Sequence, residues 1–353
     1  MAENSKIQWT HHTFNPWSGC SKVHAGCTHC YAEVNYSVKM RGVKWGPNGT
    51  RVKTANWSEP LKWNRAAEKA GERHRVFCAS LADVFEDWQG PILDHHGNQL
   101  WHNGNGRYEA AEHSYYAAVT MDDLRRDLFA LIDATPNLDW LLLTKRPENI
   151  VRMWQPISRE IWGKRYQDTN AFDPEWQPTK EQRSGLYRPN VWLGTSISDQ
   201  PTADKFAPEL LACRDLSPVL FLSAEPLLGP VNAFDYLRGN SYQQWANGGG
   251  PNQCRHGIAA GLRCNDCSHI DWVIVGGESG GHARACNAEW IESLVTQCRD
   301  AAVPCFVKQL GSNHWGESPE CGFARVPLED SKGGDWDEWP ESWRVRQFPV
   351  EAT

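Results

Sequence analysis

Residues 138–147 read LDWLLLTKRP, and residues 271–280 read DWVIVGGESG. In both stretches an uninterrupted apolar run ends in polar or glycine residues. Uninterrupted hydrophobicity is typical of strands that are covered on both faces, as they are in a parallel sheet. The two stretches therefore predict buried parallel strands, with polar side chains just beyond their carboxyl ends.

Similar short apolar runs recur along the chain and alternate with helical patterns. Seven strands are predicted, at residues 6–9, 75–79, 138–143, 190–194, 219–223, 271–276 and 303–307. Helices are predicted after the capping-box pattern at Thr120, at residues 201–213, and after Asn287. The repeating strand–helix order implies right-handed βαβ units. We therefore expect an α/β fold, a complete or partial (β/α) TIM-like barrel.

Long polar spacers interrupt this rhythm. Residues 1–311 are expected to form the barrel, and residues 312–353 a C-terminal extension packed on it. Insertions are expected at about residues 87–118, 154–188 and 239–269. In a barrel such insertions belong to loops, and the loops at the carboxyl ends of the strands build the active site.

Composition excludes several classes of protein. The 353 residues have a net charge of −7, with 22% charged and 40% hydrophobic residues, which excludes wholesale disorder. No run of about eighteen apolar residues occurs, so no membrane span is expected. The first residues also lack the pattern of a secretion signal. We therefore expect a cytoplasmic protein, in which any contact with nucleic acid needs a local basic groove.

The twelve cysteines fall into two clusters and six isolated positions. The first cluster has the spacing C-x6-C-x2-C and consists of Cys20, Cys27 and Cys30. Twelve cysteines without a secretion signal indicate thiols in a reducing compartment, rather than a disulfide scaffold. Isolated thiols of this kind usually pack in the core, whereas clustered thiols are candidate metal ligands.

The first cluster directly follows the first predicted strand, where a barrel places its active site. Three thiolates can hold zinc together with a histidine, and four histidines are near: His11, His12, His24 and His29. Three thiolates can also hold a [4Fe–4S] cluster in which one iron stays open. The open iron can bind the amino and carboxylate groups of S-adenosylmethionine, whose reductive cleavage gives a 5′-deoxyadenosyl radical.

Six motifs carry a resemblance to a known family: IQWTHHTFNPWSGCSKVHAGCTHCYAE (7–33), LLLTKRP (141–147), VWLGTSI (191–197), FLSAEPLLGP (221–230), DWVIVGGESG (271–280) and VPCFVKQLG (303–311). On these motifs, which cover about residues 6–311, the sequence resembles the radical S-adenosylmethionine superfamily. Within it, the sequence is most similar to the three-cysteine family found in phages and prophages. Most of the superfamily has the spacing C-x3-C-x2-C, so the longer first gap of this chain is a departure.

The resemblance implies an enzyme with a [4Fe–4S] cluster, S-adenosylmethionine and a reductant such as flavodoxin or ferredoxin. For a phage-encoded protein it implies the cytoplasm of a bacterial host. It also directs the expected substrate toward a nucleotide or nucleic-acid base, as in the modification of phage DNA.

Polar residues follow each predicted strand and can face a ligand at the barrel mouth. For catalysis we expect Glu225, Glu278 and Lys308. For cofactor binding we expect Ser80, Asp83, Lys145, Arg146, Ser196, Gly276, Gly277 and Glu278. Cationic side chains suit a carboxylate or phosphate, and a serine suits ribose hydroxyls. The alternative for each residue is a loop polar group that contacts water.

The second cysteine cluster has the spacing C-x9-C-x2-C in a segment of low apolar content. Three cysteines and a histidine suit a structural zinc ion, and the candidate ligands are Cys254, His256, Cys264, Cys267 and His269. An auxiliary iron–sulfur cluster or unligated thiols are the alternatives.

Tryptophans crowd the first third of the chain, and basic residues are frequent between residues 39 and 65. Aromatic rings interleaved with cations are typical of surfaces that stack nucleic-acid bases. The alternative is that the tryptophans cover the barrel ends and the basic residues form a solvated face. Two other functions stay open: a zinc protein that binds nucleic acid without catalysis, and a zinc hydrolase with Glu225 or Glu278 as base.

Overall fold

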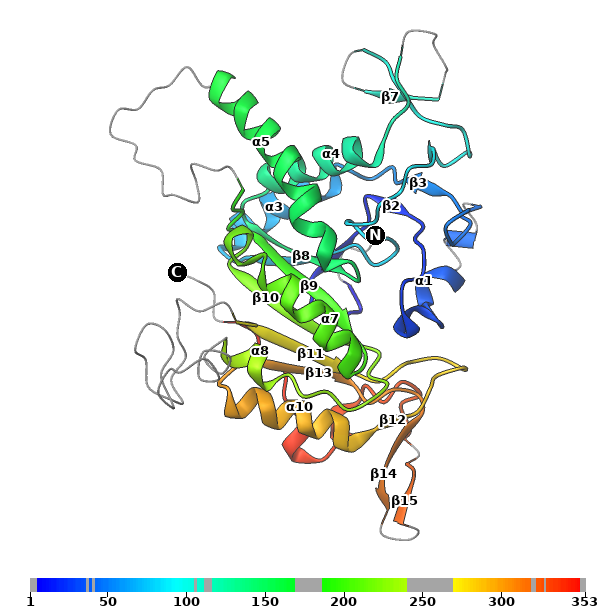
Figure 1. The fold of residues 1–353 in the computed structure, drawn as a ribbon, viewed down its shortest axis with the longest axis vertical. Coiled ribbons are helices and arrows are strands. Elements are labelled where there is room, and N and C mark those ends of the chain that lie inside the picture. Colours follow the sequence, from blue (N-terminus) through cyan, green and yellow to red (C-terminus); the bar gives the residue numbers. More distant parts are fainter. Residues whose placement is uncertain are drawn as a thin grey trace, which may run out of the picture. The chain divides into compact units, whose positions relative to one another are not determined.

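The computed structural model (Figure 1) describes residues 5–35, 38–39, 42–104, 107–110, 116–168, 186–239, 269–318, 322–326 and 328–349. The chain divides into two compact units. The first unit comprises residues 1–23, 30–192 and 215–218, and the second comprises residues 24–29, 193–214 and 219–353.

The main element of the fold is a seven-stranded sheet. In spatial order its strands are β1 (His12–Phe14), β4 (His74–Cys78), β8 (Leu138–Thr144), β9 (Val191–Ile197), β10 (Val219–Ala224), β11 (Trp272–Gly276) and β13 (Cys305–Gln309). This order follows the chain without reversal. The α/β class and the parallel sheet are therefore confirmed, since the pairs β1–β4, β4–β8, β10–β11 and β11–β13 are all parallel.

Six of the seven predicted strands coincide with strands of this sheet. Every residue of β9, β10 and β11 is buried, as expected for strands covered on both faces. The prediction at residues 6–9 is wrong, because that segment forms bends and turns and the first strand is His12–Phe14. This strand buries a histidine and a threonine beside one phenylalanine, so it lacks the apolar run used to find the others.

In the first unit, smaller elements accompany β1, β4 and β8. A three-stranded sheet contains β2 (Trp17–Ser18), β3 (Arg51–Lys53) and β5 (Ile92–Leu93), and a hairpin contains β6 (Trp101–His102) and β7 (Tyr108–Glu109). The helices are α1 (Tyr31–Val34), α3 (Glu59–Ala70), α4 (Met121–Asp133) and α5 (Ile150–Asp168). The expected insertion at 87–118 therefore contains short strands. The segment expected as an insertion at 154–188 begins within α5, which continues to Asp168.

In the second unit, α10 (Ala288–Asp300) runs beside β11 and β13 (Figure 1). The other helices are α7 (Gln200–Leu211) and α8 (Phe234–Arg238), and the other strands are β12 (Cys286–Asn287), β14 (His314–Ser318) and β15 (Gly322–Arg325). The C-terminal segment packs on the sheet edge, since Val307 N–H donates to Val345 O at 2.8 Å and Gln347 N–H donates to Cys305 O at 2.8 Å.

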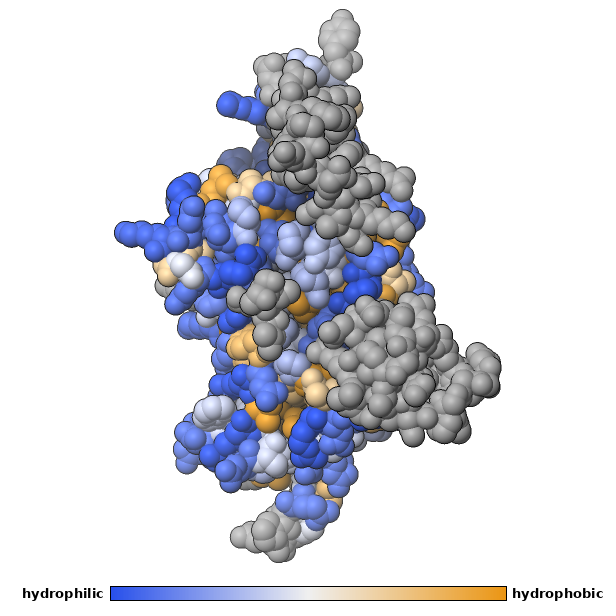
Figure 2. Space-filling view, turned by 90° about the vertical axis from the view of Figure 1, so that its left-hand side faces the viewer, coloured by the Kyte–Doolittle hydropathy of each residue, from blue (hydrophilic) through white to orange (hydrophobic). Residues whose placement is uncertain are grey.

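The predicted helix starts are confirmed in detail. Thr120 and Asp123 form the reciprocal capping box of α4, and the Asn287 side chain accepts from Glu289 N–H at the start of α10. One face of α10 is buried and carries Ile291, Leu294, Val295 and Cys298. Among the described residues, no helix has the length and apolarity that a membrane span requires. Figure 2 shows mostly hydrophilic side chains on one face, with hydrophobic ones scattered among them.

Gly194 provides a test of the packing around β9. A Cβ at this position would lie 2.3 Å from the Phe221 ring. We expect Gly194→Ala to lower the free energy of unfolding by about 1–3 kcal/mol, the usual cost of overpacking a core. Urea unfolding followed by circular dichroism measures this loss. Gly281→Ala is the matched control, because a Cβ there would meet no atom within 4 Å. Equal stability of the two variants would contradict the packing described.

Three histidines lie together at the starts of β1 and β4. His12 Nε2 and His74 Nδ1 are 3.1 Å apart, and the rings of His11 and His74 stack at 5.0 Å. Burial and the charges of Arg75 and His74 lower the pKa of His11 to about 4. Burial and the two neighbouring imidazoles lower the pKa of His12 to about 4 as well. Both rings are therefore neutral in the folded protein.

This cluster predicts a loss of stability in mild acid. Between the ordinary histidine pKa of 6.5 and about 4, the unfolded chain binds protons that the folded chain excludes. Stability should therefore fall as the pH falls through this window and should be constant just above it. Urea midpoints at pH 7.5, 6.5 and 5.5 measure the slope. His11→Asn can still accept from Arg75 N–H but does not titrate, so its slope should be shallower. A wild-type midpoint that is the same at all three pH values would refute this account.

Candidate functional site

A turn at Gly19 directly precedes Cys20, the first cysteine of the cluster. Gly19 has φ +114°, and a Cβ there would lie 2.2 Å from Thr50 O, so only glycine fits. Gly19 N–H donates to Leu81 O at 3.0 Å, which ties the turn to the segment after β4. Cys20 follows directly and is partly buried. Its position is therefore fixed by the backbone on its amino-terminal side.

A guanidinium group lies against the Cys20 sulfur. Arg146 Nη1 donates to Cys20 Sγ at 3.6 Å, and Arg146 Nη2 donates to Ser21 O at 2.7 Å. Burial and the carboxylates of Asp83 and Glu86 raise the pKa of the Cys20 thiol to about 12, while Arg146 acts in the opposite direction. Without a metal the thiol is protonated, and the arginine supplies the positive charge that a bound thiolate needs nearby.

Glu86 organises the next residues of the loop. Its carboxylate accepts from Ser21 N–H at 2.9 Å and from Arg51 Nε and Nη2 at 2.6 and 2.7 Å. Arg51 Nη2 also donates to Ser21 Oγ at 2.9 Å, and its guanidinium lies 4.1 Å from the Trp88 ring centroid. Arg51 is completely buried. Ser21 is thus held through both its backbone and its side chain.

Asp83 completes this network. It accepts from Arg146 Nη1 at 2.8 Å, from Thr144 Oγ1 at 2.7 Å and from the backbone N–H of Lys145 at 3.1 Å. We call Arg51, Asp83, Glu86 and Arg146 the cysteine-anchor network. Two arginines balance two carboxylates within it, so its buried charges are paired. It also brings the carboxyl ends of β4 and β8 to Cys20.

Ser80 forms hydrogen bonds with two nearby side chains, those of Asn15 and Tyr31. Asn15 Nδ2 donates to Ser80 Oγ at 3.0 Å, and the Tyr31 hydroxyl donates to Ser80 O at 2.8 Å. Cys30 precedes α1 and packs against Ala32, Val38 and Leu81. The structure therefore brings Ser80, Asp83 and Arg146 around the cysteine loop, as supports of its backbone.

In the second unit, a separate ion network holds the middle of the cysteine loop. Arg284 donates to both carboxylate oxygens of Glu278, at 2.9 and 2.7 Å, and its Nη1 donates to Ala25 O at 2.8 Å. His29 Nδ1 lies 3.3 Å from Glu278 Oε2. Burial alone would raise the pKa of Glu278, but its hydrogen bonds with Arg284 outweigh burial and hold the pKa below its usual value. Glu278 is thus an ionised anchor of residues 24–29, the segment that contains Cys27.

A second charged pair lies at the carboxyl ends of strands β10 and β13. Lys308 Nζ, on β13, donates to Glu225 Oε1 after β10, and both side chains are partly exposed. Between them, a Cβ at Gly276 would lie 3.6 Å from Glu225 Cδ, so the glycine leaves this pair room. Gly277 instead packs against β13, since its Cβ would lie 2.1 Å from Leu310 O. Of the two glycines, only Gly276 borders the charged pair.

The remaining predicted residues have different surroundings. Ser196 is buried within β9. His269 Nε2 lies 3.2 Å from Asp271 Oδ1, within an ion pair at the amino-terminal end of β11. The other four residues predicted for the second metal site, Cys254, His256, Cys264 and Cys267, lie outside the described residues.

The candidate metal ligands of the first cluster all lie in the described residues. Cys20 and Cys30 belong to the first unit and Cys27 to the second, and all three are free thiols. Within the described ranges, no three histidine, cysteine, aspartate or glutamate side chains are grouped closely enough to hold a metal ion. The loop thus carries three free thiols, one of which contacts a guanidinium.

Three important residues escaped sequence analysis: Arg51, Glu86 and Arg284. Arg51 was counted with the basic residues between 39 and 65, where the charge suggested an exposed surface, but it is buried against Glu86. The polar residue types gave no sign of their pairing, because the partners are separated by 35 residues or more in the first unit. Arg284 stands close to Glu278 in sequence, and that short spacing was the one usable signal.

Comparison with known proteins gives a family for the chain. The sequence model of one family, described as "Protein of unknown function (DUF5131)", matches residues 4–102 and 101–340. The chain belongs to this family. No curated protein and no solved structure matches the chain.

This finding corrects the resemblance drawn from the sequence. The assignment to the radical S-adenosylmethionine superfamily, and to its three-cysteine phage family, is wrong, because the matching family is a different one of unknown function. The cysteine spacing is consistent with this correction, since C-x6-C-x2-C differs from the superfamily's C-x3-C-x2-C. Similar apolar strands with polar ends occur in many α/β proteins, so the shared motifs reflected fold more than family.

The cysteine-anchor network predicts a large effect of Arg146→Met. The substitution keeps most of the apolar stem but leaves Asp83 without its charged partner in a buried site. We expect a loss of about 3–5 kcal/mol in the free energy of unfolding, measured by urea titration. Arg152→Met is the control, because the Arg152–Asp87 pair is exposed and should be worth less than about 1 kcal/mol. A loss at Arg146 no larger than at Arg152 would contradict the network's role.

Proposed function

We propose that this chain is a metalloenzyme in which Cys20, Cys27 and Cys30 hold a [4Fe–4S] cluster. The observation that carries the proposal is the cysteine loop itself: it offers three free thiols and is anchored by a buried ion network at residues 20–21 and by a partly exposed one at residues 24–29. Proteins support metal ligands in this way, with a surrounding shell of hydrogen bonds that fixes each ligand.

The position of the loop also supports an active site. In the first unit, Cys20 lies beside residues that follow β4 and β8. In the second unit, Ala25 and His29 contact the Arg284–Glu278 pair, which follows β11. The carboxyl ends of parallel strands are where α/β barrels bind ligands. The sheet order, which follows the chain without reversal, suits an incomplete TIM-like barrel and not a doubly wound sheet.

Three cysteines leave one iron of a cubane without a protein ligand, and we propose that S-adenosylmethionine binds there. When bound, such a cluster supplies an electron that breaks a carbon–sulfur bond of this cofactor, with flavodoxin or ferredoxin as the proposed reductant. This part of the proposal rests on the ligand count and does not depend on family membership.

The protein's own residues then have distinct roles. Arg146 donates an N–H to Cys20 and holds it, while Arg284 and Glu278 hold the Cys27 segment. Glu225 and Lys308 form the partly exposed charged pair at the strand ends, and we propose that they bind or exchange protons with the substrate. Glu278 is already bonded to Arg284, so we assign it to positioning.

We propose a nucleotide or nucleic-acid base as the substrate. The tryptophan-rich first third supplies rings with cations over them, as where Lys53 Nζ lies 4.6 Å from the Trp57 ring centroid. Rings and cations in this arrangement are used to stack and neutralise nucleotides.

Anaerobic reconstitution with ferrous iron and sulfide tests the metal centre. We expect a brown protein with about four irons per chain. Removing any one thiol, by Cys20→Ala, Cys27→Ala or Cys30→Ala, should abolish most of the visible absorption, because three ligands are the minimum for such a cluster. Cys213→Ala is the matched control, since this buried cysteine lies outside the loop and should not change iron loading.

The same samples test the chemistry. With dithionite and S-adenosylmethionine, the loaded wild-type chain should release 5′-deoxyadenosine, which chromatography detects. A chain that binds only zinc at these cysteines would contradict the proposal and favour a zinc protein. A chain that holds four irons but never cleaves S-adenosylmethionine would retain the metal centre and remove the proposed cofactor.

A further inference from the structure

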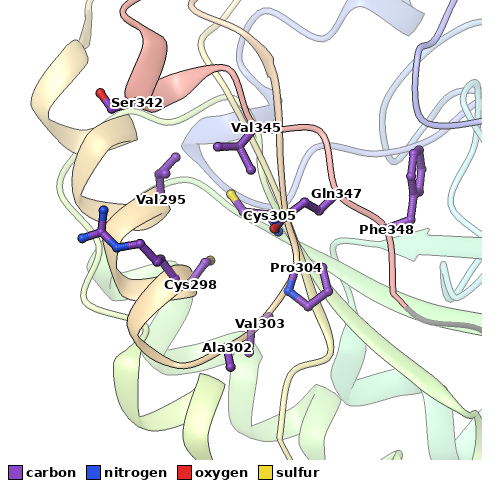
Figure 3. Close-up of a pocket in the computed structure, with 11 residues that line it drawn as sticks. Val295, Cys298, Ala302, Val303, Pro304, Cys305, Ser342, Val345, Gln347 and Phe348 are labelled. Carbon is purple, nitrogen blue, oxygen red and sulfur yellow. The ribbon is translucent and has the colours of Figure 1, made fainter.

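A pair of buried thiols borders a cavity in the second unit, at the end of β13 opposite Lys308. Cys298 lies in the last turn of α10 and is fully buried, and Cys305 is the first residue of β13 and is 2% exposed. Both thiols line the same cavity, and the side chain of Cys298 lies beside that of Cys305. Figure 3 shows both sulfur atoms in the space between α10 and β13.

The cavity has a volume of about 530 Å³. Its lining combines apolar side chains, among them Val295, Val303, Val345 and Phe348, with polar atoms and the two cysteines. Gln347 (Figure 3) adds a polar group, and Arg299 also lines the cavity. This lining suits a small molecule without charge. Such a molecule can reach the two sulfur atoms by entering the cavity, without passing through the packed core.

The backbone around Cys305 is held in place. Gln347 Oε1 accepts from Cys305 N–H at 3.3 Å, and Cys305 O accepts from Gln347 N–H at 2.8 Å. On the helix side, Val303 N–H donates to Cys298 O at 2.9 Å, which ties the strand entry to the end of α10. The two thiols therefore keep their contact without movement of either element.

We propose that Cys298 and Cys305 are a modification site, at which exchange with a small neutral disulfide forms a reversible disulfide bond between them. The neighbouring Cys305 side chain and burial raise the pKa of Cys298, so we assign the second step of the exchange to Cys298. The site is separate from the cysteine loop and does not rest on the proposed metal centre.

The exchange balances in two steps. The Cys305 sulfur attacks one sulfur of the small disulfide, whose S–S bond breaks, and the first small thiol leaves with the Cys305 proton. The Cys298 sulfur then attacks Cys305 in the mixed disulfide, and the second small thiol leaves with the Cys298 proton. The protein loses two hydrogen atoms and the small disulfide gains them. The bond formed would link α10 to the strand edge that residues 345–347 cover.

Peptide mapping of the full chain tests this site, with hydroxyethyl disulfide as the probe. After exposure of the folded protein, free thiols are alkylated in denaturant and the chain is cut with trypsin. The sequence places Cys286 and Cys298 on peptide 285–299 and Cys305 on peptide 300–308. We expect these two peptides to become linked, and to remain linked in Cys286→Ser.

Cys286 is the internal control, because it is a similarly buried thiol on the same peptide and burial raises its pKa to about 12. In Cys298→Ser the linked peptides should disappear, and Cys305 should carry the hydroxyethyl mixed disulfide instead. Two outcomes would overturn the proposal: the two peptides remaining unlinked with all three of their cysteines alkylated after exposure of the folded protein, or Cys286 reacting as readily as Cys305.

Discussion

The cysteine loop depends on one set of buried interactions, the pairing of Arg51 and Arg146 with Asp83 and Glu86. Buried ions cost free energy unless they are paired and hydrogen-bonded, and here each carboxylate accepts from an arginine and from a backbone N–H. Hydrophobic residues would fill this volume with less risk to stability. The network therefore suggests selection for a fixed loop conformation, since it sets the positions of residues 20 and 21 on both backbone and side-chain atoms.

The middle of the loop is held by the same kind of interaction. Arg284 joins Glu278 to the carbonyl of Ala25, so the segment that contains Cys27 has its own charged anchor. Metal-binding loops need such support for their ligands, which agrees with the role proposed for the three thiols.

Much of the fold followed from the sequence, because hydrophobic runs and caps are local signals. The strands around Trp140 and Trp272 and the capping box at Thr120 were found in this way. The first strand was missed because its buried residues include a histidine and a threonine. Ion pairing was also missed, because Arg51 and Glu86 meet only in the folded chain. Arg146 and Asp83 were predicted to bind a cofactor, and in the structure they form an ion pair with each other, which residue type alone does not reveal.

The central claim is that the sulfurs of the first cluster bind iron. Iron K-edge X-ray absorption of the chain, isolated without oxygen, tests it most directly. The account predicts an iron atom surrounded by sulfur, with a second shell of neighbouring irons. A spectrum without iron, or one in which only oxygen and nitrogen surround the metal, would contradict it.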